Sequence, residues 1–254
     1  MDTNKNLYTI IYSTVLVVLV AVILAMAAYL LKDAQQRNIS IETKQLVLRA
    51  VHLGEDATQL EADKAGYIEG EYAKYITDTT ISEGGESLPL YICRIDSVQK
   101  YYIVPLHGAG LWGPIWGYIA LKGDINTVYG AVFDHKGETP GLGAEIATPQ
   151  FQAQFADKQI FDGDNFVSIG VIKGGAEKGN THQVDAISGG TITSKALESM
   201  VKTCVGKYLE FFKSLKEDAS QKLLLQSDSS AIASPITDST AVSATAAEEV
   251  TSKK

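Results

Sequence analysis

The sequence predicts an α+β protein with a single N-terminal transmembrane helix, followed by a domain of mostly antiparallel sheet with flanking helices. Three observations support this fold class. Residues 6–31 contain no charged side chain. Five short stretches between residues 88 and 173 are rich in Tyr, Ile and Val and are bounded by Gly, Asp or Asn, as β-strands are. Near the end of the chain, apolar residues recur every three or four positions, which is the spacing of an amphipathic helix.

The apolar run 7–31 is long enough to cross a membrane. Its 25 residues would span roughly 37 Å as a helix, and the hydrocarbon core of a bilayer is about 30 Å thick. A cleaved secretory signal is the alternative, because Ala25-Met26-Ala27 resembles a cleavage site. The run continues through residues 29–31, beyond the length of a signal's apolar core, so we favour an uncleaved anchor. Lys5 and Lys32 lie on its two sides, and the charges therefore leave its orientation open.

The other elements follow in chain order. Residues 1–6 form a short N-terminal tail, and residues 33–54 carry apolar side chains at helical spacing up to Gly54, which predicts a stalk helix. Residues 55–76 are charged and weakly periodic, so we expect a helix followed by a loop. The later elements are strands at 88–94, 100–106, 115–121, 128–135 and 166–173, a short helix at 148–155 and the amphipathic helix at 197–215.

The C-terminal residues 226–254 differ from the rest of the chain. Of these 29 residues, 17 are Ser, Thr or Ala and none is aromatic. Such a segment buries too little apolar surface to offset the entropy lost on ordering, so we expect it to be disordered. The folded domain is therefore expected at residues 55–225.

Composition excludes several classes of function. The net charge is −8, with no basic patch, so nucleic acid is not an expected partner. The four histidines stand at spacings that do not match a metal site, and no serine or cysteine lies in a pattern typical of a nucleophilic triad. Cys93 and Cys204 match no zinc or iron–sulfur pattern and are expected to be buried free thiols, although one disulfide is possible in an oxidising compartment.

Two glycine-rich stretches in the middle of the chain have both a structural and a functional interpretation. Residues 107–118 place both tryptophans among four glycines, either as a loop that fills the core or as a platform on which a flat heteroaromatic ligand stacks. Residues 135–145 contain Pro140-Gly141, which predicts a type II turn. Glycines around Thr139 and Glu138 would also make this turn a cradle for a polar ligand.

A third stretch, residues 185–194, leads directly into the amphipathic helix. Its Gly189-Gly190 pair followed by Thr191 is typical of a phosphate site, because the first N–H groups of a helix are unpaired and its dipole attracts anions. Helix capping by Thr193 or Ser194 is the simpler alternative, but it leaves the glycine pair unexplained. The stretch is neither a Walker A loop, which needs a lysine, nor a Rossmann fingerprint.

Together these stretches resemble a known family. The run from Asp185 to Thr191 is similar to the flavinylation motif of FMN-binding domains, in which the phosphate of FMN is esterified to a threonine. With residues 135–143, residues 110–113 and the single anchor, the chain resembles the C-subunit family of the Na+-translocating NADH:quinone oxidoreductase over about residues 1–215. One departure is Gly190, where the family usually has Ala.

The resemblance implies a membrane-anchored flavoprotein that carries covalent FMN and relays electrons within that oxidoreductase and translocase. It implies a single-pass protein of the bacterial inner membrane with a periplasmic FMN domain, partnered by the other membrane subunits and matured by a flavin transferase. Thr191 would carry the FMN, and the flavin transferase would recognise Asp185 and Ser188. The remaining cofactor-binding residues that it implies are Gly189, Gly190, Thr193, Glu138, Thr139, Gly141, Leu142, Gly143, His182 and Trp112. No residue is assigned to catalysis or to metal binding.

Two other functions are compatible with the same sequence. The G subunit of the related Rnf electron-transport complex shares the threonine motif. A cell-envelope scaffold without a cofactor would use the anchor and stalk to position partners, and its glycine stretches would be only turns.

Overall fold

A computed structural model describes residues 6–54, 63–96 and 99–217. Contacts divide the chain into a unit of residues 1–213, to which the following description refers, and a unit of residues 214–254, of which 214–217 are described and helical. The predicted disordered tail at 226–254 and most of the predicted N-terminal tail lie outside the described residues.

Helix α1 (Asn6–Ala50) joins the predicted transmembrane and stalk helices into one element. Lys32, which lies between the two predicted helices, and the mostly polar residues 33–38 that follow do not interrupt it, because they include neither Gly nor Pro. Among the described helices, α1 alone is long and apolar enough to be a candidate membrane span. Its residues 9–40 are exposed, whereas Leu46, Val47, Leu48 and Ala50 are buried against the domain.

The end of α1 comes before the predicted stop at Gly54. His52 adopts a left-handed φ of 55°. The N–H groups of His52 and Leu53 donate to the carbonyls of Arg49 (3.0 Å) and Leu48 (2.9 Å), which is the bonding pattern of a Schellman motif. The second helix, α2 (Lys64–Tyr75), starts at Asp63, whose carboxylate accepts the Gly66 N–H.

The five-stranded sheet has the order β1-β2-β3-β4-β5, and every neighbouring pair is antiparallel. Four predicted strands are confirmed as β2 (Glu86–Arg94), β3 (Lys100–Ala109), β4 (Pro114–Leu121) and β5 (Val128–His135). Strand β1 (Ile76–Glu83) was not predicted, because its threonine-rich sequence has no clear apolar alternation. It pairs with β2 across the Gly84-Gly85 turn, where both glycines have positive φ.

The segment after β5 is less regular. Short helical turns, η2 (Gly143–Ala147), α3 (Pro149–Gln152) and η3 (Ala153–Phe155), cover the helix predicted at 148–155, which Thr148 caps. The strand predicted at 166–173 is wrong as a single element: it is divided between β7 (Asn165–Phe166) and β8 (Gly170–Ile172), because Ser168 has a φ of 62°. Strand β7 pairs with β6 (Phe161–Asp162), and β8 runs parallel to β9 (Gln183–Asp185).

The predicted C-terminal helix corresponds to α4 (Thr191–Gly206), which buries one face. It begins six residues earlier than predicted and is followed by a turn at Lys207–Tyr208, after which helix resumes at Leu209. The turn forms where the N–H groups of Lys207 and Tyr208 donate three residues back, to Cys204 and Val205. Tyr208 then fixes the chain against the sheet by donating its hydroxyl to the Pro89 carbonyl at 2.5 Å.

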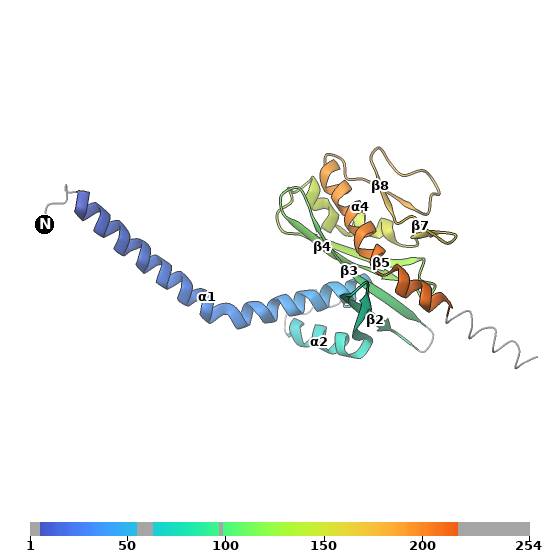
Figure 1. The fold of residues 1–254 in the computed structure, drawn as a ribbon, viewed down its shortest axis with the longest axis horizontal. Helices are drawn as coiled ribbons and strands as arrows, with labels where there is room; N and C mark the ends of the chain where they lie inside the picture. Colours follow the sequence, from blue (N-terminus) through green and yellow to red (C-terminus); the bar gives the residue numbers. More distant parts are fainter. Residues whose placement is uncertain (1–5, 55–62, 97–98, 218–254) are drawn as a thin grey trace, which may run out of the picture. The chain divides into compact units, whose positions relative to one another are not determined.

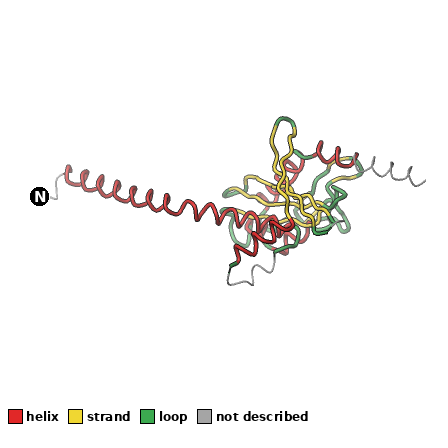
Figure 2. Tube along the Cα trace, turned by 90° about the horizontal axis from the view of Figure 1, so that it is seen from below, coloured by secondary structure: helices red, strands yellow, loops and turns green. Residues whose placement is uncertain are grey.

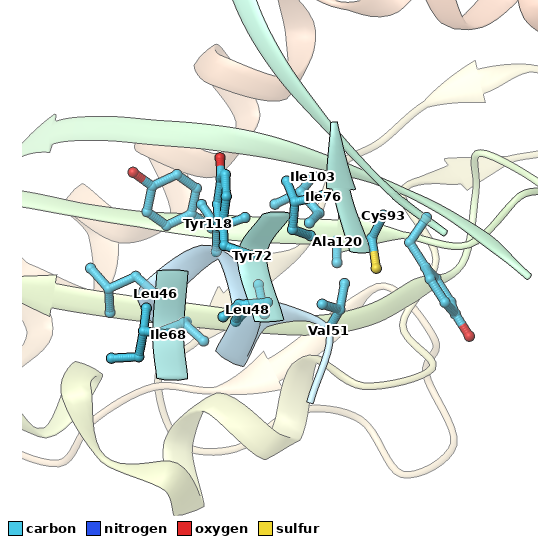
Figure 3. Close-up of a cluster of buried hydrophobic side chains, with 14 residues drawn as sticks. Leu46, Leu48, Val51, Ile68, Tyr72, Ile76, Cys93, Ile103, Tyr118 and Ala120 are labelled. Carbon is cyan, nitrogen blue, oxygen red and sulfur yellow. The ribbon is translucent and has the colours of Figure 1, made fainter. Parts of the chain in front are cut away.

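Helices cover both faces of the sheet. Helix α4 lies on the opposite side of the strands from α2 and the C-terminal end of α1 (Figures 1 and 2). On the α1 side, a buried cluster combines side chains of α1, α2 and the sheet, among them Leu48, Ile68, Ile103 and Cys93 (Figure 3). The fold class predicted from the sequence is therefore confirmed.

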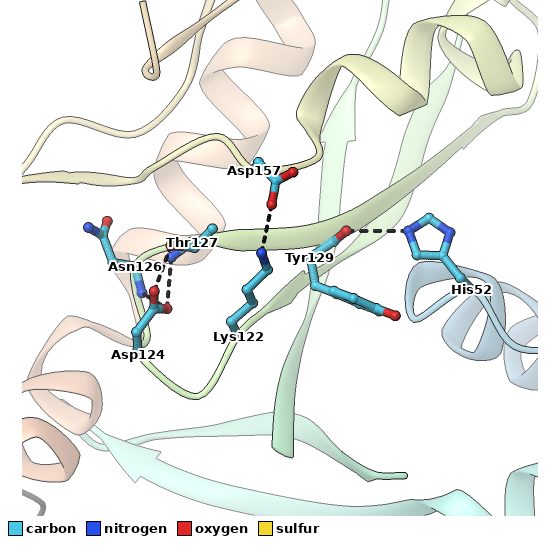
Figure 4. Close-up of polar contacts among 7 residues, drawn as sticks. All are labelled: His52, Lys122, Asp124, Asn126, Thr127, Tyr129 and Asp157. Atoms are coloured by element: carbon cyan, nitrogen blue, oxygen red, sulfur yellow. Dashed lines mark hydrogen bonds and ion pairs between the residues drawn. The ribbon is translucent and has the colours of Figure 1, made fainter. Parts of the chain in front are cut away.

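Polar contacts order the connections at the β5 edge. The Asp124 carboxylate accepts the N–H groups of Asn126 (3.0 Å) and Thr127 (2.9 Å), and Lys122 pairs with Asp157 at 2.6 Å (Figure 4). Burial by itself would raise the pKa of Asp124. The hydrogen bond from the Thr127 hydroxyl, the two N–H bonds and the charge of Lys122 outweigh burial and lower the pKa below its ordinary value.

Close packing of α4 on β3 depends on Gly108. A Cβ atom at this position would lie 2.9 Å from the Cβ of Met200, so we expect Gly108→Ala to destabilise the protein by about 1–3 kcal/mol through overpacking. Gly70 in α2 is exposed with open space around it, and Gly70→Ala should stabilise by about 0.5–1 kcal/mol through helix propensity. Urea unfolding of the full chain in detergent measures the change in the free energy of unfolding for both variants. The same change in both would contradict close packing at Gly108.

Candidate functional site

The first segment of the site is the tip of the β3–β4 hairpin. The Gly110 N–H donates to the Gly113 carbonyl at 2.8 Å, which closes the turn. The two residues between them cannot reach the core, and Leu111 is 46% and Trp112 70% exposed. The Trp112 ring is therefore a surface side chain and does not fill the core.

The second segment is the turn that follows β5. The Leu142 N–H donates to the Thr139 carbonyl at 3.1 Å, and Gly141 has a φ of 73°, as a type II turn with glycine at its third position requires. The predicted turn at Pro140-Gly141 is therefore present. It leads directly into η2, whose first residue, Gly143, is buried.

The third segment is the start of α4. Gly189 takes a φ of 76°, and Gly190 is the N-cap residue with no side-chain cap hydrogen bond. The glycine pair also allows a close approach, because a Cβ at Gly189 would lie 2.6 Å from Cδ2 of Leu142. The capping role considered for Thr193 and Ser194 is thus wrong, and the first N–H groups of α4 have no side-chain cap.

These three segments enclose a pocket of about 390 Å³, within the range of small-molecule sites. Nine of the thirteen residues that the resemblance implied line it. They are Trp112, Glu138, Thr139, Leu142, Gly143, Gly189, Gly190, Thr191 and Thr193. Leu111 and Ile192 line it as well but were not predicted as cofactor-binding residues. The available signal was their position next to Trp112 and Thr191.

Four implied residues do not line this pocket. The Asp185 carboxylate accepts the N–H of Ala176 at 2.7 Å, and Nδ1 of His182 lies 2.7 Å from the Gln159 carbonyl. Ser188 is exposed next to the glycine pair, and Gly141 is at the exposed corner of its turn. Asp185, although its carboxylate is hydrogen-bonded, is exposed at the surface like Ser188.

The wall of the pocket is organised by Glu138, which is only 4% exposed. Its Oε2 accepts the Thr193 hydroxyl at 2.6 Å, and its Oε1 accepts the Trp112 N–H at 2.9 Å. One carboxylate therefore joins the hairpin tip, the turn after β5 and the start of α4. Neighbouring glycines make room for it, because a Cβ at Gly110 would lie 2.5 Å from Oε1 and one at Gly143 would collide with Oε2.

The ionisation of Glu138 follows from these contacts. Burial is the largest influence and by itself would raise the pKa. Hydrogen bonds from the Thr193 hydroxyl and the N–H groups of Trp112 and Leu111, with the nearby His135, outweigh it and lower the pKa below its ordinary value. The pocket wall thus holds a carboxylate that is negatively charged at neutral pH.

Three hydroxyl groups at the start of α4 have different environments. Thr193 donates to Glu138, and Ser194 Oγ accepts the Ile187 N–H at 3.1 Å; both side chains are 1% exposed. Thr191 is half-buried at the pocket, and among the described residues its hydroxyl has no hydrogen-bond partner. Of the three, Thr191 is therefore the hydroxyl available to a ligand.

An apolar rim surrounds the polar wall. Beyond α1, the described large apolar side chains that are exposed are Leu111, Trp112, Leu142, Val167 and Ile192. All but Val167 line this pocket. Such clustering is typical of a surface that a ligand or partner covers.

The cysteines and possible metal ligands form no second site. Cys93 and Cys204 are both free thiols. Cys93 is buried as predicted, which raises its pKa to about 11, whereas Cys204, also predicted to be buried, is only partly buried. Within the part of the chain that the structure describes, no group of three or more His, Cys, Asp or Glu side chains could hold a metal ion.

Comparison with known proteins identifies the family. A family model described as the FMN-binding domain matches residues 110–206, which contain all three pocket segments. The crystal structure of the C subunit of Na(+)-translocating NADH-quinone reductase from Parabacteroides distasonis is 36% identical, with a TM-score of 0.63, and the match covers 72% of this chain and 96% of that one. The chain belongs to the family of the C subunit of Na(+)-translocating NADH-quinone reductase.

Curated members of this family support the assignment. The protein from Vibrio anguillarum is 27% identical over 225 residues, which is 77% of this chain and 87% of that protein. The protein from Pseudomonas aeruginosa is 38% identical over 121 residues, or 46% of each chain. These relatives are named as subunits of an oxidoreductase.

The Glu138–Thr193 contact has a measurable energy. Thr193→Val removes the hydroxyl donor, and we expect a loss of about 1–3 kcal/mol in stability at neutral pH, because a buried charged acceptor loses a partner. Thr193→Ser keeps the hydroxyl and is the control. Urea unfolding of the full chain in detergent measures both.

The same contact predicts a pH dependence. Because folding lowers the pKa of Glu138, its contribution to stability is present above the carboxyl's ordinary pKa and is lost as the pH falls through the lower, folded value. The difference between the wild type and Thr193→Val should therefore shrink in acid. A difference that stays constant from pH 7 to acid would contradict an ionised Glu138.

Proposed function

We propose that the protein is a membrane-anchored flavoprotein subunit that carries FMN esterified to Thr191 and relays electrons within a Na+-translocating NADH:quinone reductase. The observation that carries the proposal is the available Thr191 hydroxyl in a pocket where Thr193 and Ser194 are hydrogen-bonded. Family membership and the match to the FMN-binding domain support the choice of cofactor.

The residues present fit FMN. The uncapped start of α4 offers backbone N–H donors and the positive end of its dipole to the phosphate next to Thr191. Gly189 and Gly190 let Leu142 and Ile187 pack closely against the start of α4. The exposed Trp112 ring with Leu111 and Ile192 offers apolar surface to a flat ring system. FMN bound there would supply electron transfer, whereas the protein holds it, shields it and sets its electrostatic surroundings.

Maturation by a flavin transferase agrees with the two motif residues that lie outside the pocket. Asp185 and Ser188 are exposed, so an external enzyme can reach them while Thr191 faces the pocket. We therefore assign them to recognition by the transferase. Gly141 supports the turn next to the pocket, and His182, which faces the Gln159 carbonyl, is the weakest of the proposed contacts.

Helix α1 supports the membrane assignment. We propose that residues 7–31 span the bacterial inner membrane once, that residues 33–54 form a stalk, and that the FMN domain at 55–225 is periplasmic, next to the other membrane subunits. The exposure of residues 9–40 fits a helix whose surroundings are lipid and partner subunits.

Substitution tests the attachment site. In protein co-expressed with a flavin transferase, Thr191→Ala should abolish the ultraviolet fluorescence of the denatured band in a gel, because the ester oxygen is lost. Thr203→Val, at an exposed position of the same helix that does not line the pocket, should retain it. Fluorescence that survives Thr191→Ala would contradict the proposal, and a colourless, non-fluorescent wild type would favour a scaffold without a cofactor.

Labelling tests the orientation. Ser82 is exposed near the β1–β2 turn, and in a Cys204→Ser background Ser82→Cys should react with a membrane-impermeant maleimide in intact spheroplasts. The native Cys93 is buried and should remain unlabelled in the parent. Labelling that appears only after lysis would place the domain in the cytoplasm.

A further inference from the structure

Glu138 stands out among the residues that line the pocket. Of the eleven lining residues it is the only one with a charged side chain. No Lys or Arg in the described part of the chain forms an ion pair with it. Its charge is stabilised by hydrogen-bond donors and by His135, without a lysine or arginine counter-ion.

The position of this charge is fixed. Both oxygens accept hydrogen bonds, from Trp112 N–H and the Thr193 hydroxyl. The absence of a side chain at Gly110 and Gly143 leaves the space that its two oxygens occupy, since a Cβ at either position would collide with one of them. A charge that is held in place and poorly solvated acts on its neighbourhood at a lower effective dielectric than a mobile surface carboxylate does.

We propose that Glu138 sets the reduction potential of the flavin, as a fixed negative charge in the wall of the pocket that opposes the arrival of electrons. This rests on the proposed function, namely FMN held at Thr191 in this pocket. Full reduction of a flavin takes up two electrons and one or two protons, and any reduced form with net negative charge is raised in energy by a nearby carboxylate. The charge therefore lowers the potential and favours transfer of the electrons to the next carrier.

In this account Glu138 is a positioning residue with an electrostatic effect, and it takes no part in a bond-making step. Its hydrogen bonds hold the three pocket segments, whereas its charge acts on the cofactor. The two contributions are separable, because Glu138→Gln removes the charge and Thr193→Val removes one hydrogen bond while the charge remains.

The test is a redox titration of the full chain, purified in detergent after co-expression with a flavin transferase. For Glu138→Gln we expect a higher midpoint potential. At the wild-type midpoint the ratio of reduced to oxidised flavin should rise about tenfold, the order of effect expected of one fixed unit charge in the pocket wall at an effective dielectric of about 20. Glu145→Gln is the matched control, because Glu145 accepts the Gly141 N–H on the neighbouring turn but does not line the pocket; its potential should not change.

Thr193→Val separates charge from geometry. Its potential should equal that of the wild type or lie below it, since the carboxylate loses a donor and keeps its charge. The proposal is overturned if Glu138→Gln leaves the potential unchanged, or if Thr193→Val raises it as much as Glu138→Gln does.

If Glu138→Gln does not accept flavin, Glu138→Ala removes the same charge and is titrated in its place. Intact mass reports loading separately: a wild type without flavin contradicts the proposed function, whereas a loaded protein with an unchanged potential contradicts only the role of Glu138.

Discussion

The hydrogen bond between Glu138 and Thr193 is the contact on which the candidate site depends. It joins residues 55 positions apart in the chain, and with the Trp112 N–H bond it holds the hairpin tip, the turn after β5 and the start of α4 around one carboxylate. Without it, a charged side chain that is 4% exposed would lose a main partner, which is costly at a buried position.

The rest of the fold brings these three segments together. Strands β3, β4 and β5 are adjacent and antiparallel, so the β3–β4 turn and the last residue of β5 lie at the same end of the sheet. Helix α4 crosses β3 at close range where Gly108 leaves room for Met200, and this packing aims the start of the helix at the two turns. The close approach of Gly189 to Leu142 completes the enclosure.

Much of this could be predicted from the sequence, wherever a local pattern determines the structure. The Pro140-Gly141 turn, four sheet strands and the buried face of α4 follow from turn chemistry and periodicity. Strand β1 could not be predicted, because its threonines give no alternating pattern and its structure depends on pairing with β2. The split at Ser168 and the helix end at His52 were missed because both residues take left-handed conformations that are uncommon outside glycine.

In the site too, features set by a local pattern could be predicted, whereas contacts between distant residues could not. The motif indicated Thr191 and the glycines, but sequence alone could not show that Thr193 and Ser194 are engaged, since their partners are Glu138, far away in the chain, and the Ile187 backbone. Ile192, in the first turn of α4, is exposed at the apolar rim, although its sequence position alone did not indicate this. Attachment of FMN at Thr191 can be tested by tandem mass spectrometry of the peptide that spans these three hydroxyls, from full-length protein matured with a flavin transferase. We expect the FMN adduct on Thr191; an adduct on Thr193 or Ser194, or an unmodified peptide, would show that Thr191 is not the attachment site.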